Sequence, residues 1–267
     1  SDLNFLIGPK LYEANWMELT QQGYLAKVKC VEVQCPMAPS FQEAYNNCKR
    51  EQNNLSFISN GNNNKQKANQ LQQLLYVMNP NKIRAVEFLV RYHEEQGHKI
   101  IIFSDKVEPL QFYAETLQRP MIYGDTMDWE RQAVLTAFRQ PNRDIQTICL
   151  SKVGDMSINL PDANVILQVS GHFGSQMQEA QRMGRILRPK QDPNITAFFY
   201  TLVSSGTKEI DFSLKRRQYL VGHGYEYQIV DNLQDRIASD PLAQSYAYET
   251  PEQDRELLRK LLVQSCH

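Results

Sequence analysis

The chain contains short, almost wholly apolar runs that alternate with longer stretches of helical spacing. Apolar runs of this length are typical of strands covered on both faces. They predict strands at residues 27–35, 99–103, 120–123, 147–150, 165–169 and 196–203. The first of these alternates in two registers, which predicts a bulge or a change of face.

Helical spacing predicts helices in the segments between these strands. We expect them at residues 40–49, 68–78, 81–96, 105–118, 128–138, 207–221 and 252–264. Asn81 is expected to cap the helix at 81–96 and Asp105 to cap the next one, since short polar side chains accept the first free N–H groups. The helix at 81–96 should bury one apolar side, namely Ile83, Val86, Phe88, Leu89 and Tyr92.

This alternation of strands and helices predicts an α/β fold with a doubly wound parallel sheet and helices on both faces. Two parts depart from the pattern. Residues 51–67 are rich in Asn, Gln and Ser and are expected to form a flexible insert, because they can bury little apolar surface. Residues 231–267 are expected to form a polar tail that ends in a lone helix.

Composition excludes several classes of protein. With 42% hydrophobic and 22% charged residues, the 267-residue chain resembles an ordinary globular protein. Its net charge of −1 means that any contact with nucleic acid must come from local patches. The five cysteines form no C-x-x-C and are expected to be reduced thiols, and His93 and His98 have the wrong spacing for zinc. No apolar run reaches the roughly 20 residues of a membrane span, and no signal peptide is expected.

The segment at residues 174–190 carries the strongest chemical signal. On a helix, Gln181, Arg185 and Arg188 share one face. One interpretation is a solvated basic face on an amphipathic helix. The other is a pair of arginine fingers, which stabilise charge on a transferring phosphoryl group. Gly184 favours the second, because a mid-helix glycine costs about 1 kcal/mol unless the backbone needs room there.

Polar clusters also follow three of the predicted strands, where ligands gather in open α/β sheets. They are 104–105 (S-D), 124–126 (G-D-T) and 151–155 (S-K-V-G-D). Hydroxyl, lysine and glycine residues at a strand end can hold a phosphate through side chains and backbone N–H groups. Asp105 also has the simpler interpretation of a helix cap.

Residues 181–188, Q-R-M-G-R-I-L-R, resemble the Q-x-x-G-R-x-x-R motif VI of superfamily 2 helicases. The longer run around them resembles the XPB-type DNA helicases, the ATPase subunits of the transcription and repair factor TFIIH. Residues 99–105 resemble motif IV, residues 122–126 the segment that follows it, and residues 151–161 motif V. Matching positions extend over most of residues 3–227.

The resemblance implies a RecA-like second helicase domain at residues 27–230, preceded by the end of the first helicase domain at 1–26 and followed by a helical C-terminal tail. It implies that Arg185 and Arg188 reach the γ-phosphate of ATP and that Gln181 senses the nucleotide. The remaining implied roles are nucleotide binding for Gly154 and Asp155, and DNA backbone contacts for Ser104, Gly124, Ser151 and Lys152. Asn159 replaces the Asp that many relatives carry at the end of motif V, which removes a charge.

The chain lacks a P-loop, G-x-x-x-x-G-K-[ST], and an acidic D-E-x-H box. ATP and Mg²⁺ are therefore expected to be bound mainly by the first helicase domain, upstream of Ser1, and the chain alone should be inactive. By resemblance the partners are DNA, that first domain and other TFIIH subunits, with no membrane. The implied setting is the nucleus, in promoter opening and nucleotide excision repair.

Two alternatives remain open. One is another superfamily 2 motor, such as an RNA helicase or a chromatin remodeller. The other is a non-catalytic module that docks partners through its tail and the basic run K-R-R at residues 215–217. Substitution of Arg185 in the full-length protein separates the last possibility, because a docking module would keep its ATPase unaltered.

Overall fold

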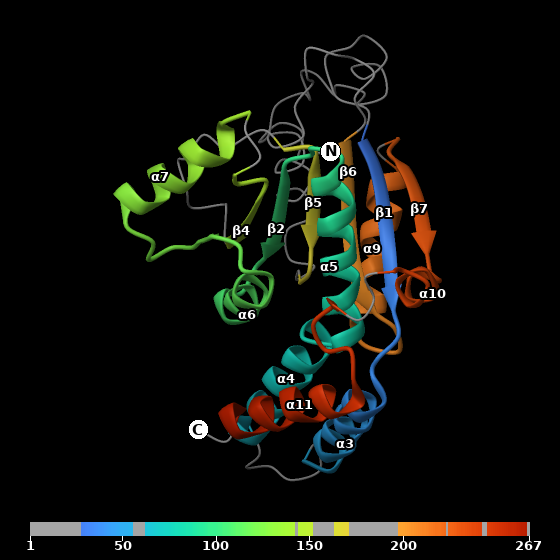
Figure 1. Cartoon of the computed structure of the whole chain (residues 1–267). Coiled ribbons are helices and arrows are strands. Elements are labelled where there is room, and N and C mark those ends of the chain that lie inside the picture. Colours follow the sequence, from blue (N-terminus) through green and yellow to red (C-terminus); the bar gives the residue numbers. More distant parts are fainter. Residues whose placement is uncertain are drawn as a thin grey trace, which may run out of the picture.

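The computed structural model describes residues 28–55, 62–141, 144–151, 163–170, 197–222, 224–241 and 245–265. Their centre is a seven-stranded sheet with the order β3-β4-β2-β5-β6-β1-β7 (Figure 1). Every pair of neighbours is parallel, which confirms the predicted parallel sheet. The strands are β1 (Val28–Cys35), β2 (Ile100–Ser104), β3 (Met121–Ile122), β4 (Thr147–Ser151), β5 (Val165–Gln168), β6 (Ala197–Ser204) and β7 (Glu226–Val230).

Helices cover both faces of this sheet, as the alternating pattern predicts (Figure 1). On one face, α5 (Pro80–Glu95) and α6 (Val107–Leu117) pack over β2, and the short α10 (Leu233–Ala238) joins the same core, which contains Ile100 and Ile102. On the other face, α7 (Asp128–Arg139) and α9 (Glu209–Gly222) contribute to a second core that also contains Ile101 and Phe103. The period of two along β2 therefore places its side chains in two separate cores. Among the described residues, no helix is both long and apolar enough to cross a lipid bilayer.

The first strand is regular, so the predicted bulge in it is wrong. Consecutive residues of β1 pair with consecutive residues of β6 on one side and of β7 on the other. Its two apolar registers have a different cause. Val31 and Val33 enter one core and Cys30 enters the other, because helices cover both faces of the strand.

The start of α5 also differs from the prediction. Asn79, not Asn81, caps the helix: its side chain accepts from the N–H of Asn81 at 3.3 Å and from the N–H of Ala38 at 3.1 Å. Asn79 is fully buried and so ties the chain after β1 to α5. Tyr92, predicted to face inward, is 50% exposed, and Phe88 is only partly buried.

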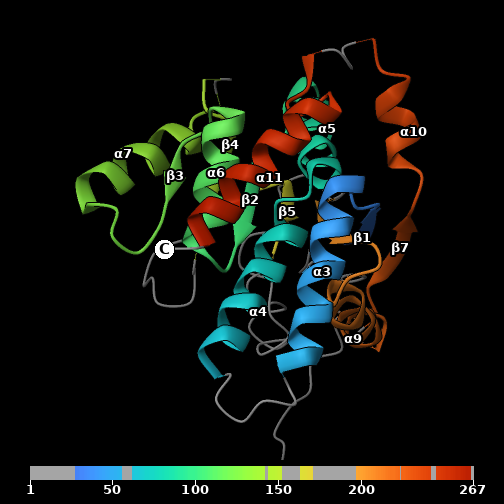
Figure 2. The same ribbon diagram turned by 90° about the horizontal axis from the view of Figure 1, so that it is seen from below.

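The predicted flexible insert at residues 51–67 is wrong over the part that the structure describes. Residues 51–55 end helix α3 (Pro39–Leu55), and residues 62–67 begin helix α4 (Asn62–Val77), which packs beside it (Figure 2). Residues 56–61 lie outside the described residues. Tyr45 and Leu75 anchor the two helices in the core, so the polar ends extend helices that are stabilised elsewhere.

The terminal helix is not alone. Helix α11 (Pro251–Ser265) packs against α3 and α4 and buries Leu257 and Leu261 (Figures 1 and 2). Arg91 of α5 contacts the segment before α11. Its guanidinium group donates to the Ser245 hydroxyl at 2.6 Å, and the guanidinium carbon lies 4.3 Å from the centre of the Tyr246 ring. The C-terminal tail is therefore packed on the sheet domain through apolar and polar contacts.

Acid is expected to destabilise this fold through His93. The ring is fully buried, with Nε2 3.0 Å from the Tyr200 hydroxyl and Nδ1 2.9 Å from Nδ1 of His98. Burial, and secondarily His98, lowers the pKa of His93 from 6.5 to about 4. The unfolded chain therefore binds a proton that the folded chain does not, so this stability is complete above pH 6.5 and is lost as the pH falls toward 4.

Urea unfolding of the wild type should show a loss of about 2 kcal/mol from this group between pH 7 and pH 5. In His93→Gln the same contribution is absent, so the variant should have a flatter pH profile over this interval. Equal pH slopes for the two proteins would contradict this account.

Candidate functional site

The carboxyl ends of the parallel strands lie along one edge of the sheet, and serines mark several of them. In the neighbouring strands β4 and β2, Ser151 and Ser104 are paired in register. On the other side of β2, β5 ends at Gln168 and the chain leaves it through Ser170. Two of the residues predicted to contact DNA, Ser104 and Ser151, are thus brought side by side.

Ser104 is fully buried, and its hydroxyl is engaged within the chain. Its Oγ lies 2.7 Å from Oγ of Ser170 and 2.9 Å from the carbonyl oxygen of Lys106. Ser170 in turn donates to Oδ1 of Asp105 at 2.7 Å. The predicted capping role of Asp105 is wrong, because Lys106 is the N-cap of α6 and no side chain caps that helix. Asp105 instead links the ends of β2 and β5.

Ser151 is also buried, and its Oγ has no hydrogen-bond partner in the part of the chain that the structure describes. Buried hydroxyls without a partner are rare in proteins. The residues that follow Ser151 in motif V, including Lys152, Gly154, Asp155 and Asn159, lie outside the described residues.

Gly124 lies in an exposed loop after β3, and hydrogen bonds of the Thr126 and Arg131 side chains hold the backbone of this loop in place. Thr126 Oγ1 accepts from the N–H of Tyr123 at 3.0 Å, and Arg131 donates to the carbonyl oxygens of Tyr123, Gly124 and Thr126 at 3.4, 3.4 and 3.0 Å. A Cβ at Gly124 would meet no atom within 4 Å, so packing does not demand glycine. The loop offers a preformed backbone surface.

The segment that carries Gln181, Arg185 and Arg188 lies outside the described residues. The structure describes the strand before this segment, β5, and the strand after it, β6. Ser170 lies two residues after the end of β5, and Ala197 begins β6, which pairs with β5 in a parallel register. The sequence between these strands is thus attached at both ends to the centre of the sheet.

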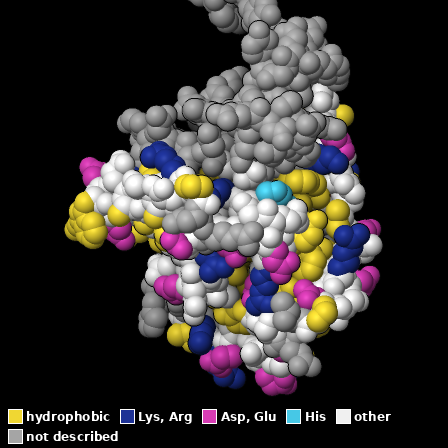
Figure 3. All heavy atoms as spheres, turned by 45° about the horizontal axis from the view of Figure 1, so that its top comes forward, with side chains coloured by type: hydrophobic (Ala, Val, Ile, Leu, Met, Phe, Trp, Pro, Cys, Tyr) yellow, Lys and Arg dark blue, Asp and Glu magenta, His cyan; other side chains and the backbone are white. Residues whose placement is uncertain are grey.

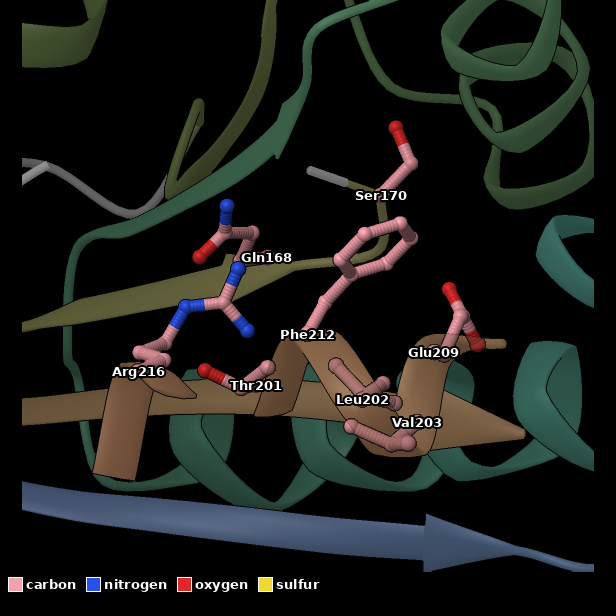
Figure 4. A pocket seen from close by; sticks show the side chains of 8 residues that line it. All are labelled: Gln168, Ser170, Thr201, Leu202, Val203, Glu209, Phe212 and Arg216. Carbon is pink, nitrogen blue, oxygen red and sulfur yellow. The ribbon is translucent and has the colours of Figure 1, made fainter. Parts of the chain in front are cut away.

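A pocket beside these strand ends was not predicted from the sequence. Residues of β5, β6 and α9 and the residue Ser170 after β5 line this pocket. In Figure 4 the side chain of Arg216 points toward Gln168. The lining residues are Gln168, Ser170, Thr201, Leu202, Val203, Glu209, Phe212 and Arg216. Glu209 belongs to a buried ion pair, since both of its carboxylate oxygens accept from Nζ of Lys82, at 2.8 and 2.6 Å. No sequence signal marked Lys82, because it lies among the apolar positions of its helix.

Charges of both signs are interspersed on the face seen in Figure 3. Within the described residues of that face, neither sign of charge forms a continuous patch. Among the described residues, no cluster of His, Cys, Asp and Glu side chains has the arrangement of a metal site. Acidic groups also border the Gly124 loop, where Asp125, Asp128 and Glu130 are exposed. An anion there would have to be held by backbone N–H groups.

Solved structures define the class of this fold. The Sulfolobus solfataricus SWI2/SNF2 ATPase core in complex with dsDNA matches 74% of this chain and 47% of its own length, with a TM-score of 0.57 and 19% identity. The Pyrococcus furiosus Hef helicase domain matches 73% of this chain and 59% of its own, with a TM-score of 0.56 and 11% identity. The chain therefore shares the RecA-like α/β fold of these two domains, as predicted.

Sequence comparison gives the family. The family model of the ERCC3/RAD25/XPB C-terminal helicase matches residues 19–71 and 62–266, and the chain belongs to this family. The TFIIH helicase/translocase subunit XPB/SSL2 of Saccharomyces cerevisiae is 46% identical over 99% of this chain, and subunit XPB of Dictyostelium discoideum is 50% identical over 87%. The predicted resemblance is confirmed. The chain spans only 29% and 27% of these two relatives.

Proposed function

We propose that this chain is the C-terminal part of an ATP-dependent DNA helicase or double-stranded DNA translocase of the TFIIH XPB type. It would act in the nucleus, in promoter opening and nucleotide excision repair, together with other TFIIH subunits. The observation that carries the proposal is membership of the XPB C-terminal helicase family over nearly the whole chain. The relatives are named as general transcription and DNA repair factor subunits, which supports the setting.

In this proposal ATP and Mg²⁺ bind between the first helicase domain and this one. Arg185 and Arg188 stabilise the charge that develops on the γ-phosphoryl group, and Gln181, Gly154 and Asp155 complete the nucleotide contacts. The magnesium ion would be held mainly by the first domain, since this sequence has no P-loop and no acidic box.

DNA would be held through its phosphates at the carboxyl edge of the sheet. Gly124 would contribute a backbone N–H and Lys152 a positive charge. Ser104 and Ser151 are buried, so we propose that they act at the strand ends directly beneath the bound backbone. Contacts of this kind are independent of base sequence and weaken as salt is raised.

ATP hydrolysis by two proteins tests this proposal: the 267-residue chain and the full-length protein, each with and without duplex DNA. We expect no hydrolysis above background from the chain alone, because the phosphate cradle is missing. The full-length protein should hydrolyse ATP, faster with duplex DNA than with duplex RNA as the control. Hydrolysis by the chain alone would mean that it contains its own phosphate cradle. A full-length protein that does not respond to DNA would contradict a DNA motor.

A further inference from the structure

Two large apolar side chains, Met127 and Trp129, are exposed at the start of α7. They are 63% and 70% exposed, the highest fractions among the large hydrophobic side chains that the structure describes. The indole N–H of Trp129 donates to the sulfur of Met127 at 3.2 Å, so the two side chains lie together as one apolar surface. Scattered apolar side chains are normal on a protein surface, but a contiguous pair of this size is typical of an interaction site.

The backbone beneath this pair is fixed. Leu135 and Phe138 anchor α7 in the second core. The loop before the helix is held by Arg131, whose side chain is 14% exposed and donates to the carbonyl oxygens of Tyr123 and Thr126 at 3.4 and 3.0 Å. A partner that binds the pair therefore has little backbone to order, which lowers the cost of association.

The charges around the pair are negative. Asp125, Asp128 and Glu130 flank the apolar side chains and are exposed. Residues 125–130 contain no Lys or Arg, and the next cation, Arg131, pairs with Asp128 at 2.9 Å and donates to the loop carbonyls. Figure 3 shows apolar side chains gathered at the outer end of α7, with acidic side chains near them. An incoming group therefore meets an apolar surface with an acidic rim.

This combination discriminates between possible occupants. A nucleic-acid base can stack on an indole, but the carboxylates of the rim would repel the phosphates beside it. An arginine side chain fits both parts of the surface, because its guanidinium plane stacks on an aromatic ring and its N–H groups bond to carboxylates. An apolar residue next to that arginine would cover Met127, whose flexible thioether adapts to different shapes.

We propose that the surface formed by residues 125–130 is a docking site for a basic, apolar segment of a partner protein. An arginine of that segment lies on the Trp129 ring between the carboxylates. The site does not depend on the proposed function. The DNA contact proposed for Gly124 uses a backbone N–H, and neither Met127 nor Trp129 takes part in it.

Binding of short peptides to the 267-residue chain tests this proposal. The chain contains two tryptophans, so Trp16→Phe leaves Trp129 as the source of indole emission. The probes are blocked pentapeptides of the form Leu-X-Leu-X-Leu, in which X is Arg, Lys, Ser or Glu. Each is titrated to about 10 mM, which covers the weak affinity expected of so short a ligand.

The arginine peptide should change the Trp129 emission saturably, with a Kd on the order of 1 mM. The lysine peptide should bind more weakly, because an ammonium group does not stack as a plane. The serine and glutamate peptides should give no saturable change. Trp129→Ala, which keeps Trp16, is the control for the signal, and its emission should not respond to the arginine peptide.

Neutralising the rim tests the part played by charge. The combined changes Asp125→Asn, Asp128→Asn and Glu130→Gln keep the side-chain shapes and should weaken binding of the arginine peptide about tenfold. The matched control removes the same number of carboxylates from exposed positions on α3, α5 and α9 and should leave the affinity unchanged. Its changes are Glu43→Gln, Glu95→Gln and Asp211→Asn.

Four results would overturn the docking site. The absence of a saturable change with the arginine peptide would remove it, and equal affinity for the serine peptide would show that the surface has no preference for cations. An equal loss in the two triple variants would show that net charge, and not the rim, governs binding. A response of Trp129 to a DNA oligonucleotide but to none of the peptides would identify nucleic acid as the occupant.

Discussion

Replacing Arg188 by Ala in the full-length protein is expected to lower DNA-stimulated ATP hydrolysis by at least about a hundredfold, since arginine fingers contribute roughly 10³–10⁵ in rate. In the proposed function, this guanidinium group stabilises charge that exists only in the transition state. Its loss should therefore reduce kcat while nucleotide binding is largely kept. Single-turnover hydrolysis and nucleotide-binding measurements on the same protein check both parts.

Arg255→Ala is the matched control for this experiment. It removes the same charge from α11, where the side chain is 59% exposed and paired with Glu252 one turn earlier. Its hydrolysis rate should equal that of the wild type. If Arg188→Ala and Arg185→Ala both hydrolyse ATP at the wild-type rate, the finger assignment is wrong and a docking module becomes the better account of this chain.

Lys82→Met is expected to lower the free energy of unfolding by about 3–5 kcal/mol, the usual loss when one member of a buried ion pair is removed. Lys82 is fully buried, and its Nζ bonds both carboxylate oxygens of Glu209 and lies 3.3 Å from the carbonyl of Val169. Burial raises the pKa of Glu209 above its ordinary value of 4.5. Without Lys82 the carboxylate loses its ion-pair partner, and the N–H of Ser204, at 2.7 Å, and the charge of Arg216 are left to stabilise it.

Urea unfolding of the chain at neutral pH measures this loss. Lys29→Met is the control, because Lys29 and Glu226 form a solvent-exposed pair at 3.7 Å that should contribute about 0–1 kcal/mol. The double variant Lys82→Met with Glu209→Gln should recover part of the stability, since it removes the stranded charge. A loss below about 1 kcal/mol in Lys82→Met would show that the pair contributes little to the fold.

The sequence predicts the buried strands well, because a strand covered on both faces must be apolar along its whole length. Strand β7 lacks this signal and is not predicted. It lies at the edge of the sheet, where Glu226 and Ile229 are exposed, so its sequence is not continuously apolar. The polar ends of α3 and α4 were mistaken for a flexible insert, since the helices are stabilised by distant residues such as Tyr45 and Leu75.

The candidate site was predicted unevenly. Local motifs predict Gln181, Arg185 and Arg188, because their spacing would place them on one face of a helix; these residues lie outside the described part of the chain. The contacts of Asp105 could not be predicted in this way, because its bond to Ser170 depends on which strand lies beside β2. The sequence does not mark Lys82 as part of an ion pair. Its partner, Glu209, lies 127 residues later in the chain on α9, so the pair forms only in the folded domain.

The position of β1 in the sheet has a consequence for synthesis of the protein. β1 is the first strand described, yet its two neighbours, β6 and β7, are the last ones in the sequence: Val28 pairs with Ala197, and Lys29 pairs with Glu226. During synthesis β1 is made first, and the hydrogen-bonding groups on both of its edges stay unpaired until β6 and β7 have been made. A product terminated before β6 would therefore expose an apolar strand, which makes such products prone to aggregation.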